Sequence, residues 1–364
     1  MLKQRKKFLF MGLLVATVLV LFACNNGTKQ EVAKSAENGE ANKDASEEKV
    51  VIKIADSFPT NHQTSVLGIQ PWIERIEELG EGKIEVEYYP AEQLSKEASL
   101  LDAAKNKIAD ITYVGAQYMT DELPLTAIAG NPGIVQDAIS GSKAFNKLVQ
   151  EDLYELELKP NGVKPLWAVT TNPYQIINST HPIETIDDFK GLKIRTSGGL
   201  QENLVQYWEA SPVSTTAPEI YTAWERGTID GALLSIISWS GYQLEELVKY
   251  STTNAALSSF GIMYVVNEEV WNSWPEDVQE AVSQASEEAI EMLSTGYMDA
   301  EKELMQEYAE LGVEFYDIPE EELKKWNDSL GPLNEEWAKN LDQRGLPASE
   351  ILDKFIQYNN EFKE

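Results

Sequence analysis

The chain has little cysteine, histidine or positive charge, and each shortage excludes a class of protein. A single cysteine, Cys24, excludes an internal disulfide, so the fold must depend on packing. The two histidines, His62 and His181, have no partner at metal-ligand spacing, so both are assigned to loops and no metal site is predicted. With 60 acidic and 30 basic residues, the net charge of −30 argues against nucleic acid as a partner.

The sequence also lacks the motifs that carry enzyme chemistry. It contains no Gly-x-Ser-x-Gly elbow, no phosphate-binding glycine loop and no dinucleotide fingerprint. Acidic pairs such as Asp187-Asp188 and Glu245-Glu246 carry little information among so many carboxylates. We therefore expect a protein that is not an enzyme and that uses no cofactor.

The N-terminus predicts export. Lys3, Arg5, Lys6 and Lys7 precede an uncharged apolar run, residues 8–22, that is too short for a stable membrane span. The run ends in "LFAC", which resembles a bacterial lipobox despite the bulky Phe22. Residues 1–23 are thus predicted to be a lipoprotein signal peptide, and Cys24 to become a lipidated N-terminus on the outer face of the cell membrane. An ordinary signal peptide with a coincidental cysteine is the alternative.

Residues 24–49 are predicted to form a flexible acidic tether. Val32 is the only large aliphatic or aromatic side chain among them, so the segment cannot bury enough apolar surface to offset its ordering entropy. The remaining residues, 50–364, exceed the length that one hydrophobic core usually organises, so two lobes are expected.

Strand and helix patterns alternate through this body. The apolar stretches 50–56, 83–90 and 108–114 have strand character, and residues 66–79 and 96–107 have helical spacing between them. A second block follows, with strand-like stretches at 163–178, 192–197, 229–234 and 260–267, helical patterns at 199–210 and 217–227, and a long amphipathic pattern from Pro275 to Leu311. This order predicts an α/β fold in two blocks, with a cleft between them.

One arginine stands out in this pattern. Arg195 ends the alternating run Leu192–Ile194 and precedes the small residues 196–199. It is either a solvated charge at a strand end or a group that holds an anion. The acidity of the chain does not exclude an anion site, because the Debye length of about 8 Å at physiological salt screens its long-range repulsion. The small residues would leave room for the backbone to approach a ligand.

Four stretches in order carry a resemblance to a known family. They are "YYPAEQLSKEASLLDAAKNKIADITYV", "TIDDFKGLKIRTS", "ASPVSTTAPEIYTAWERGTIDGALLS" and "FGIMYVVNEEVWNSWPEDVQEAV". Together they resemble the solute-binding proteins of tripartite ATP-independent periplasmic (TRAP) transporters, of the C4-dicarboxylate-binding type. The resemblance implies a two-lobed, periplasmic-binding-protein-like α/β fold with a ligand cleft between the lobes and a long helix that spans both. Lobe I would comprise residues 50–170 and about 255–292, and lobe II residues 171–254 and about 293–364.

The resemblance also implies roles for three residues. Arg195 matches the arginine that pairs with the ligand carboxylate in the family, and its planar pair of donors suits that task. Leu234 stands where several members have an asparagine, and Gln175 aligns with a second family arginine. With these two anchors replaced, the site is expected to bind an acid with a single carboxylate on a less polar body.

Five aromatic residues complete the expected ligand site. Trp167, Tyr174 and Trp239 lie in stretches expected to border the cleft. Phe58 and Tyr113 lie near strand ends, where open α/β sheets bind ligands. For each aromatic residue a place in the core is the alternative.

The expected mechanism is capture of an organic acid, closure of the lobes over it, and delivery to the TRAP membrane permease subunits. Two alternatives remain. A ligand-sensing partner of a membrane kinase would share the fold, and an exported hydrolase would require a nucleophile–base pair that the sequence does not reveal.

Overall fold

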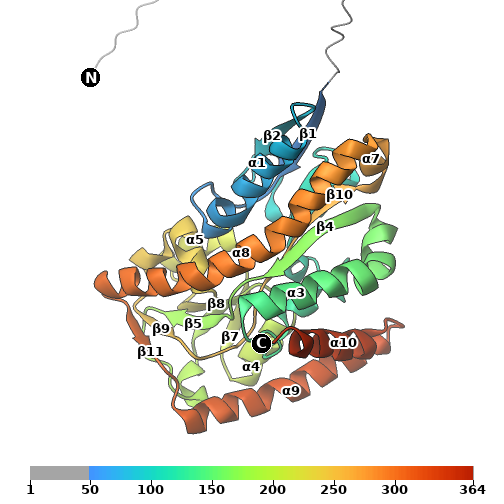
Figure 1. Cartoon of the computed structure of the whole chain (residues 1–364). Helices are drawn as coiled ribbons and strands as arrows, with labels where there is room; N and C mark the ends of the chain where they lie inside the picture. The colour runs from blue at the N-terminus through green and yellow to red at the C-terminus, as the bar shows by residue number, and fades with distance from the viewer. Residues whose placement is uncertain (1–48, 364) are drawn as a thin grey trace, which may run out of the picture. The chain divides into compact units, whose positions relative to one another are not determined.

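The computed structural model describes residues 49–363, and the fold consists of two β-sheets with helices packed around them (Figure 1). The expected signal peptide, Cys24 and the tether up to residue 48 lie outside the described residues. The element boundaries follow the expected alternation closely, since β1 (Val50–Ala55), α1 (Gln70–Leu79) and β2 (Ile84–Tyr89) fall within stretches that the hydrophobic pattern assigned to a strand, a helix and a strand.

The first sheet has five strands in the order β2-β1-β3-β10-β4. β1 is parallel to β2 and β3 (Ile111–Val114), whereas β10 (Gly261–Asn267) is antiparallel to β3 and β4 (Val163–Thr170). Every residue of β3 and β10 is buried, which explains their continuous apolar character. The helices of this part are α1, α2 (Leu100–Lys105), α3 (Ala138–Leu148), which continues as a π-helical stretch Val149–Leu158, and α7 (Glu268–Ser273).

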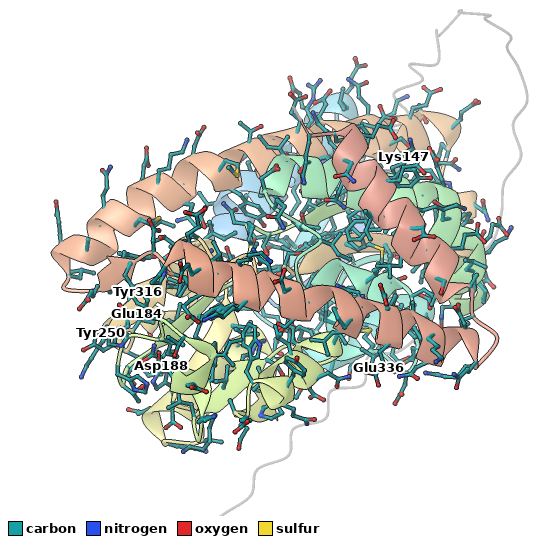
Figure 2. All side chains as sticks on the ribbon, turned by 90° about the horizontal axis from the view of Figure 1, so that it is seen from below. Lys147, Glu184, Asp188, Tyr250, Tyr316 and Glu336 are labelled. Carbon is teal, nitrogen blue, oxygen red and sulfur yellow. The ribbon has the colours of Figure 1, made fainter. Side chains whose placement is uncertain are left out.

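The second sheet has six strands in the order β11-β9-β5-β8-β6-β7. They are β5 (Gln175–Asn178), β6 (Lys193–Thr196), β7 (Ser211–Ser214), β8 (Gly231–Leu234), β9 (Tyr250–Thr252) and β11 (Glu314–Tyr316). Its helices are α4 (Leu200–Tyr207), α5 (Ile220–Glu225) and α6 (Trp239–Tyr242). Figure 2 labels Tyr250 and Tyr316 at the β9–β11 edge, where the Tyr316 hydroxyl accepts a 2.6 Å hydrogen bond from the Ile183 backbone.

Two chain segments cross side by side between the sheets. The strand-like stretch 163–178 is divided at residues 171–174, so that β4 joins the first sheet and β5 the second. The return crossing lies between β9 and β10. The two crossings pair with each other, because Thr171 N donates to Phe260 O at 3.0 Å and Tyr174 N donates to Ser258 O at 2.7 Å.

The long helix α8 (Glu276–Glu310) runs past both sheets (Figure 1). On the side of the first sheet, Trp72 of α1 donates through Nε1 to Ser286 Oγ at 3.2 Å. On the side of the second sheet, Trp239 of α6 stacks on Tyr308 with ring centroids 5.1 Å apart. The helix therefore holds both parts of the fold together.

Two further helices complete the described chain, α9 (Glu320–Asp342) and α10 (Ala348–Glu361). α9 packs against α4, whereas α10 packs against α9 and α3. The predicted lobe boundaries stay a prediction. The sequence analysis places α10 in lobe II, whereas α10 contacts α3, a helix of the first sheet.

Candidate functional site

A cavity lies where the carboxyl ends of strands from both sheets meet the crossing segments. Its volume is about 20 Å³, room for little more than one water molecule, so a ligand can enter only after the surrounding loops move apart. Its lining residues come from the loop after β1, the turn before α2, β3 and the loop that follows it, both crossings, β10, the turn after β7, and the stretch from β8 to α6. They are Phe58, His62, Thr64, Glu97, Tyr113, Tyr118, Thr171, Tyr174, Ala217, Leu234, Ser238, Tyr242, Phe260 and Ile262.

Aromatic rings form much of the cavity wall. Phe58 packs against Tyr113 with ring centroids 4.8 Å apart, and Tyr118 packs against Phe260 at 5.1 Å. Burial holds the pKa values of Tyr113 and Tyr118 well above the usual range, so both phenols stay neutral at physiological pH. Such a wall suits an apolar ligand body.

Arg195 lies in β6, against this wall. Its Nη2 atom donates to Tyr118 Oη at 2.9 Å, and Nε and Nη2 both donate to the Thr215 backbone oxygen, at 2.9 and 2.8 Å. A longer contact of 3.4 Å joins Nη1 to Leu233 O. Arg195 thus reaches the cavity wall through Tyr118 and does not itself line the cavity.

The guanidinium group is fully buried, with a relative exposure of 0%. None of the ion pairs among residues 49–363 includes Arg195, so no carboxylate of these residues lies within 4.0 Å of the guanidinium nitrogens. A buried charge without an opposite charge is costly, by several kcal/mol in real proteins. The site therefore holds a positive charge that an anion would neutralise.

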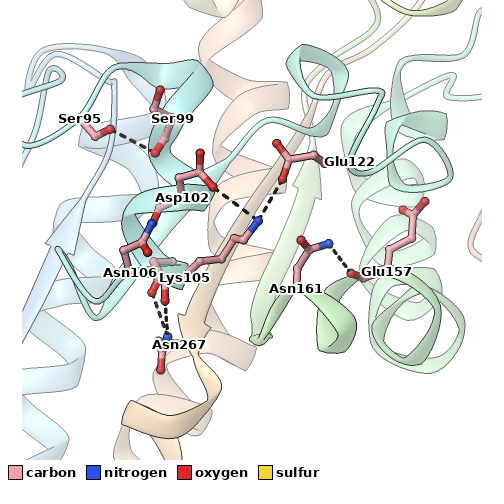
Figure 3. Close-up of polar contacts among 10 residues, drawn as sticks. Ser95, Ser99, Asp102, Lys105, Asn106, Glu122, Glu157, Asn161 and Asn267 are labelled. Atoms are coloured by element: carbon pink, nitrogen blue, oxygen red, sulfur yellow. Dashed lines mark hydrogen bonds and ion pairs between the residues drawn. The ribbon is translucent and has the colours of Figure 1, made fainter.

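One carboxyl group, Glu97, also lines the cavity. It lies in the turn before α2, which Ser95 closes by donating through Oγ to Ser99 O at 3.2 Å (Figure 3). Tyr113 Oη donates to Glu97 Oε1 at 3.1 Å, whereas Oε2 has no partner among the described residues. Burial raises the pKa of Glu97 to about 8, and the Tyr113 hydrogen bond and the Arg195 charge only partly oppose this rise. Glu97 is therefore a neutral acid at pH 7.

His62 lines the same cavity and is also neutral. Burial lowers the pKa of His62 to about 3. Its Nδ1 atom accepts a hydrogen bond from the Thr64 backbone N–H at 3.1 Å, so the proton of the neutral ring resides on Nε2. That atom is buried and has no partner among the described residues.

The structure brings four of the expected ligand residues to this cavity and places Arg195 next to it. Phe58, Tyr113, Tyr174 and Leu234 line the cavity directly. Their positions at strand ends and on a crossing segment agree with the general rule for ligand sites in α/β sheets.

Gln175, Trp167 and Trp239 do not line this cavity. The Gln175 side-chain oxygen accepts hydrogen bonds from Thr252 Oγ1 at 2.8 Å and from Ala255 N at 3.1 Å, so it serves the local structure of the second sheet. Trp167 stacks on Tyr264 with centroids 4.6 Å apart in the core of the first sheet. Trp239 stacks on Tyr308 of α8.

Gly198, one of the small residues after Arg195, lies against protein backbone, whereas the sequence suggested that it would lie against a ligand. A Cβ atom on Gly198, which has φ +96°, would lie 2.9 Å from the backbone oxygen of Gln117. The glycine thus allows a loop of the second sheet to approach a loop of the first sheet. The room that it leaves is filled by protein backbone, where a ligand was expected.

Sequence reasoning missed His62, Glu97, Tyr118, Tyr242 and Phe260. His62 shares its loop with Phe58, and Tyr118 follows β3 at the same sheet edge, so strand-end position could have identified both. Glu97 had no such signal, because its turn gave no sign of pointing into a cavity.

Two features of other protein classes are absent from the described part of the chain. Residues 49–363 contain no group of three or more His, Cys, Asp or Glu side chains arranged to hold a metal ion. No helix in the same range is both long and apolar enough to cross a membrane.

The comparisons with known proteins agree with this geometry. The family model of the bacterial extracellular solute-binding proteins, family 7, matches residues 55–340. The C4-dicarboxylate-binding periplasmic protein DctP of Rhodobacter capsulatus is 26% identical over 291 residues, covering 75% of this chain and 84% of the relative.

Two solved structures share the fold. A TRAP solute-binding protein from an unidentified marine microbe, specific for aromatic acid ligands and in complex with 3-hydroxybenzoate, has a TM-score of 0.82 and 21% identity and covers 87% of this chain and 100% of its own. One from Rhodoferax ferrireducens, in complex with benzoate, has a TM-score of 0.81 and 21% identity and covers 86% of this chain and 98% of its own. The chain therefore belongs to family 7 of the bacterial extracellular solute-binding proteins, the solute-binding proteins of TRAP transporters.

Proposed function

We propose that the protein captures a small organic acid with one carboxylate on a largely apolar, aromatic body, and delivers it to the permease subunits of a TRAP transporter. The observation that carries the proposal is the full burial of Arg195 beside an aromatic cavity, with no carboxylate of residues 49–363 in ion-pair contact. A ligand carboxylate would supply the missing negative charge and take over donors that now bond to Tyr118 and Thr215.

The character of the cavity supports a single-carboxylate ligand. Leu234 contributes an apolar surface where several members of the family place an asparagine, and Gln175 is engaged in the sheet. The described lining contains no lysine or arginine, and Arg195 reaches it from behind Tyr118. A second ligand carboxylate would thus find no cationic side chain in this lining, only rings and neutral polar groups, which do not balance its charge.

The ligands of similar proteins support the same class. The two solved structures named above hold 3-hydroxybenzoate and benzoate, and a further similar structure, from Bordetella bronchiseptica, holds (R)- and (S)-mandelate. All of these are monocarboxylic acids that carry an aromatic ring.

We further propose that the protein acts outside the cell on a lipid anchor at Cys24, with no covalent change to its ligand. Replacement of Cys24 by serine should then abolish lipid labelling and move the protein from the membrane fraction to the soluble fraction. Lipid labelling of the variant at the wild-type level would contradict the proposed anchor at Cys24, and it would not affect the proposal for the ligand site.

A screen of organic acids tests the ligand class. The mature protein is incubated with aromatic monocarboxylates, aliphatic monocarboxylates, dicarboxylates and neutral sugars, and native mass spectrometry records which ligand is retained intact. Preference for an aromatic monocarboxylate supports the proposal, and preference for a dicarboxylate or a sugar contradicts it. Turnover of a bound acid would revive the hydrolase alternative, and a kinase gene in place of a permease gene beside this one would favour sensing.

A further inference from the structure

Two polar atoms of the cavity remain without partners once Arg195 has been assigned to the carboxylate. They are Glu97 Oε2 and His62 Nε2, both buried, and both belong to described residues that line the cavity. Glu97 is 3% exposed and His62 is 1% exposed, so water at the surface cannot satisfy them. Buried polar atoms in native proteins almost always have a partner, so whatever fills the cavity is expected to supply one to each of these atoms.

The hydrogen bonds already made by His62 Nδ1 and Glu97 Oε1 determine whether the unpaired atom of each group is a donor or an acceptor. His62 Nδ1 already accepts from Thr64 N, so Nε2 carries the proton and is a donor. Glu97 Oε1 accepts from Tyr113 Oη, so the uncharged carboxyl group has Oε2 free to donate its proton. Both groups therefore seek an oxygen acceptor.

A continuous series of side-chain contacts along the cavity wall links His62 to Glu97. The His62 ring lies 5.0 Å from the Phe58 ring, which lies 4.8 Å from the Tyr113 ring, whose hydroxyl bonds to Glu97. Tyr242 packs against the other side of His62, with centroids 5.0 Å apart. Both donors therefore border the same aromatic wall of the cavity.

We propose that Glu97 and His62 form a second polar subsite that selects an acid with an additional hydroxyl or keto oxygen. The proposal rests on the function proposed above, since it takes the carboxylate to be held by Arg195. An acid that lacks the second oxygen would enter the cavity but leave two buried donors unpaired, so it would bind less tightly.

Paired ligands test this subsite. Isothermal titration calorimetry at pH 7 measures the affinities of benzoate, of the three monohydroxybenzoates, of phenylacetate and of mandelate. We expect at least one hydroxylated acid to bind about 10-fold or more tightly than its parent acid, as the loss of a hydrogen bond to a buried donor predicts. Binding of both parent acids as tightly as all of their hydroxylated forms would overturn the subsite.

Matched variants show whether these two residues cause the preference. Glu97→Gln keeps a neutral donor and should keep the preference, whereas Glu97→Met removes the polar atoms at similar size and should reduce it. His62→Asn offers Oδ1 as a substitute acceptor for Thr64 N but loses the Nε2 donor, so it should reduce the preference too. The quantity compared is the ratio of the affinities for the hydroxylated and parent acids within each variant, and circular dichroism shows that all three variants fold.

The outcomes separate this inference from the proposed function. An unchanged preference in both Glu97→Met and His62→Asn would overturn the subsite and leave Arg195 in its role. Failure of the wild-type protein to bind any of these six acids would contradict the aromatic-acid proposal itself.

Discussion

Arg195 Nη2 and Tyr118 Oη, 2.9 Å apart, join the two sheets beside the aromatic cavity. Arg195 belongs to β6 of the second sheet, and Tyr118 follows β3 of the first sheet. The hydroxyl is a neutral acceptor, since burial holds the pKa of Tyr118 well above its usual range. A carboxylate is a stronger acceptor for the same guanidinium, so a ligand can take this position while both sheets keep their contact with it.

Replacement of Arg195 should weaken ligand binding strongly. A charge-assisted hydrogen bond contributes about 1.5–3 kcal/mol, so Arg195→Gln should lower the affinity for the best acid by about 10- to 150-fold. Arg195→Lys keeps the charge but loses the planar fork, and we expect an intermediate affinity. Calorimetric titration measures all three proteins, and circular dichroism shows whether the variants are folded. Wild-type affinity in a folded Arg195→Gln protein would show that the carboxylate binds elsewhere.

Ligand affinity should decrease as the pH rises through about 8. The pKa of Glu97 is raised to about 8 by burial, and its surroundings include the hydroxyl of Tyr113 and the charges of Arg195, Glu92 and Glu219. An anionic ligand binds more easily while Glu97 is neutral, so affinity is highest below pH 8 and declines as Glu97 ionises. Titrations from about pH 6.5 to 9.5 measure this decline. The Glu97→Gln variant cannot ionise, and a decline of the same size in that variant would rule out Glu97 as its cause.

Gly241 should be required for close approach of the two sheets' loops. A Cβ atom there would clash with the His62 ring, which is itself packed between Phe58 and Tyr242. We expect Gly241→Ala to lower ligand affinity about 10-fold, because α6 and the loop after β1 could no longer close over the ligand.

A matched glycine elsewhere provides the control for this experiment. Gly331 lies in α9, and a Cβ atom there would meet no described atom outside its own helix within 4 Å. Gly331→Ala should therefore leave affinity unchanged, and no gain in stability is expected, because the next residue is Pro332 and a Cβ before a proline is disfavoured in a helix. Equal affinities of the two alanine variants would argue against a closure role for Gly241.

Trp167 should matter for stability and not for ligand affinity. It is fully buried, stacked on Tyr264 and in edge contact with Trp72 at 5.4 Å. Trp167→Ala should lower the free energy of unfolding by about 3–5 kcal/mol, as large cavities in cores do. Urea denaturation measures this loss, and titration below the transition measures affinity. If the variant kept wild-type stability but no longer bound the ligand, Trp167 would be shown to take part in ligand binding.

The sequence predicted the fold better than it predicted the site. Hydrophobic periodicity depends on local spacing, so it indicated β1, β10 and α8 within a few residues of their observed limits. It could not separate β4 from β5, because both are buried and apolar and the chain changes sheets without a break in that pattern.

Side-chain direction explains the differences at the site. Trp167 and Trp239 were expected at the cleft because they lie near it in the chain, but both rings face the core. Glu97 and His62 were passed over because burial of a carboxyl group or an imidazole depends on which elements pack around it. Strand-end position was the more reliable guide, since it led to Phe58 and Tyr113.

A crystal structure of the protein with its tightest-binding acid tests the central claim most directly. We predict that both ligand carboxylate oxygens lie about 2.7–2.9 Å from nitrogen atoms of the Arg195 guanidinium, with the ligand body among Phe58, Tyr113 and Phe260. A carboxylate bound elsewhere, with the Arg195–Tyr118 hydrogen bond still intact, would contradict the account.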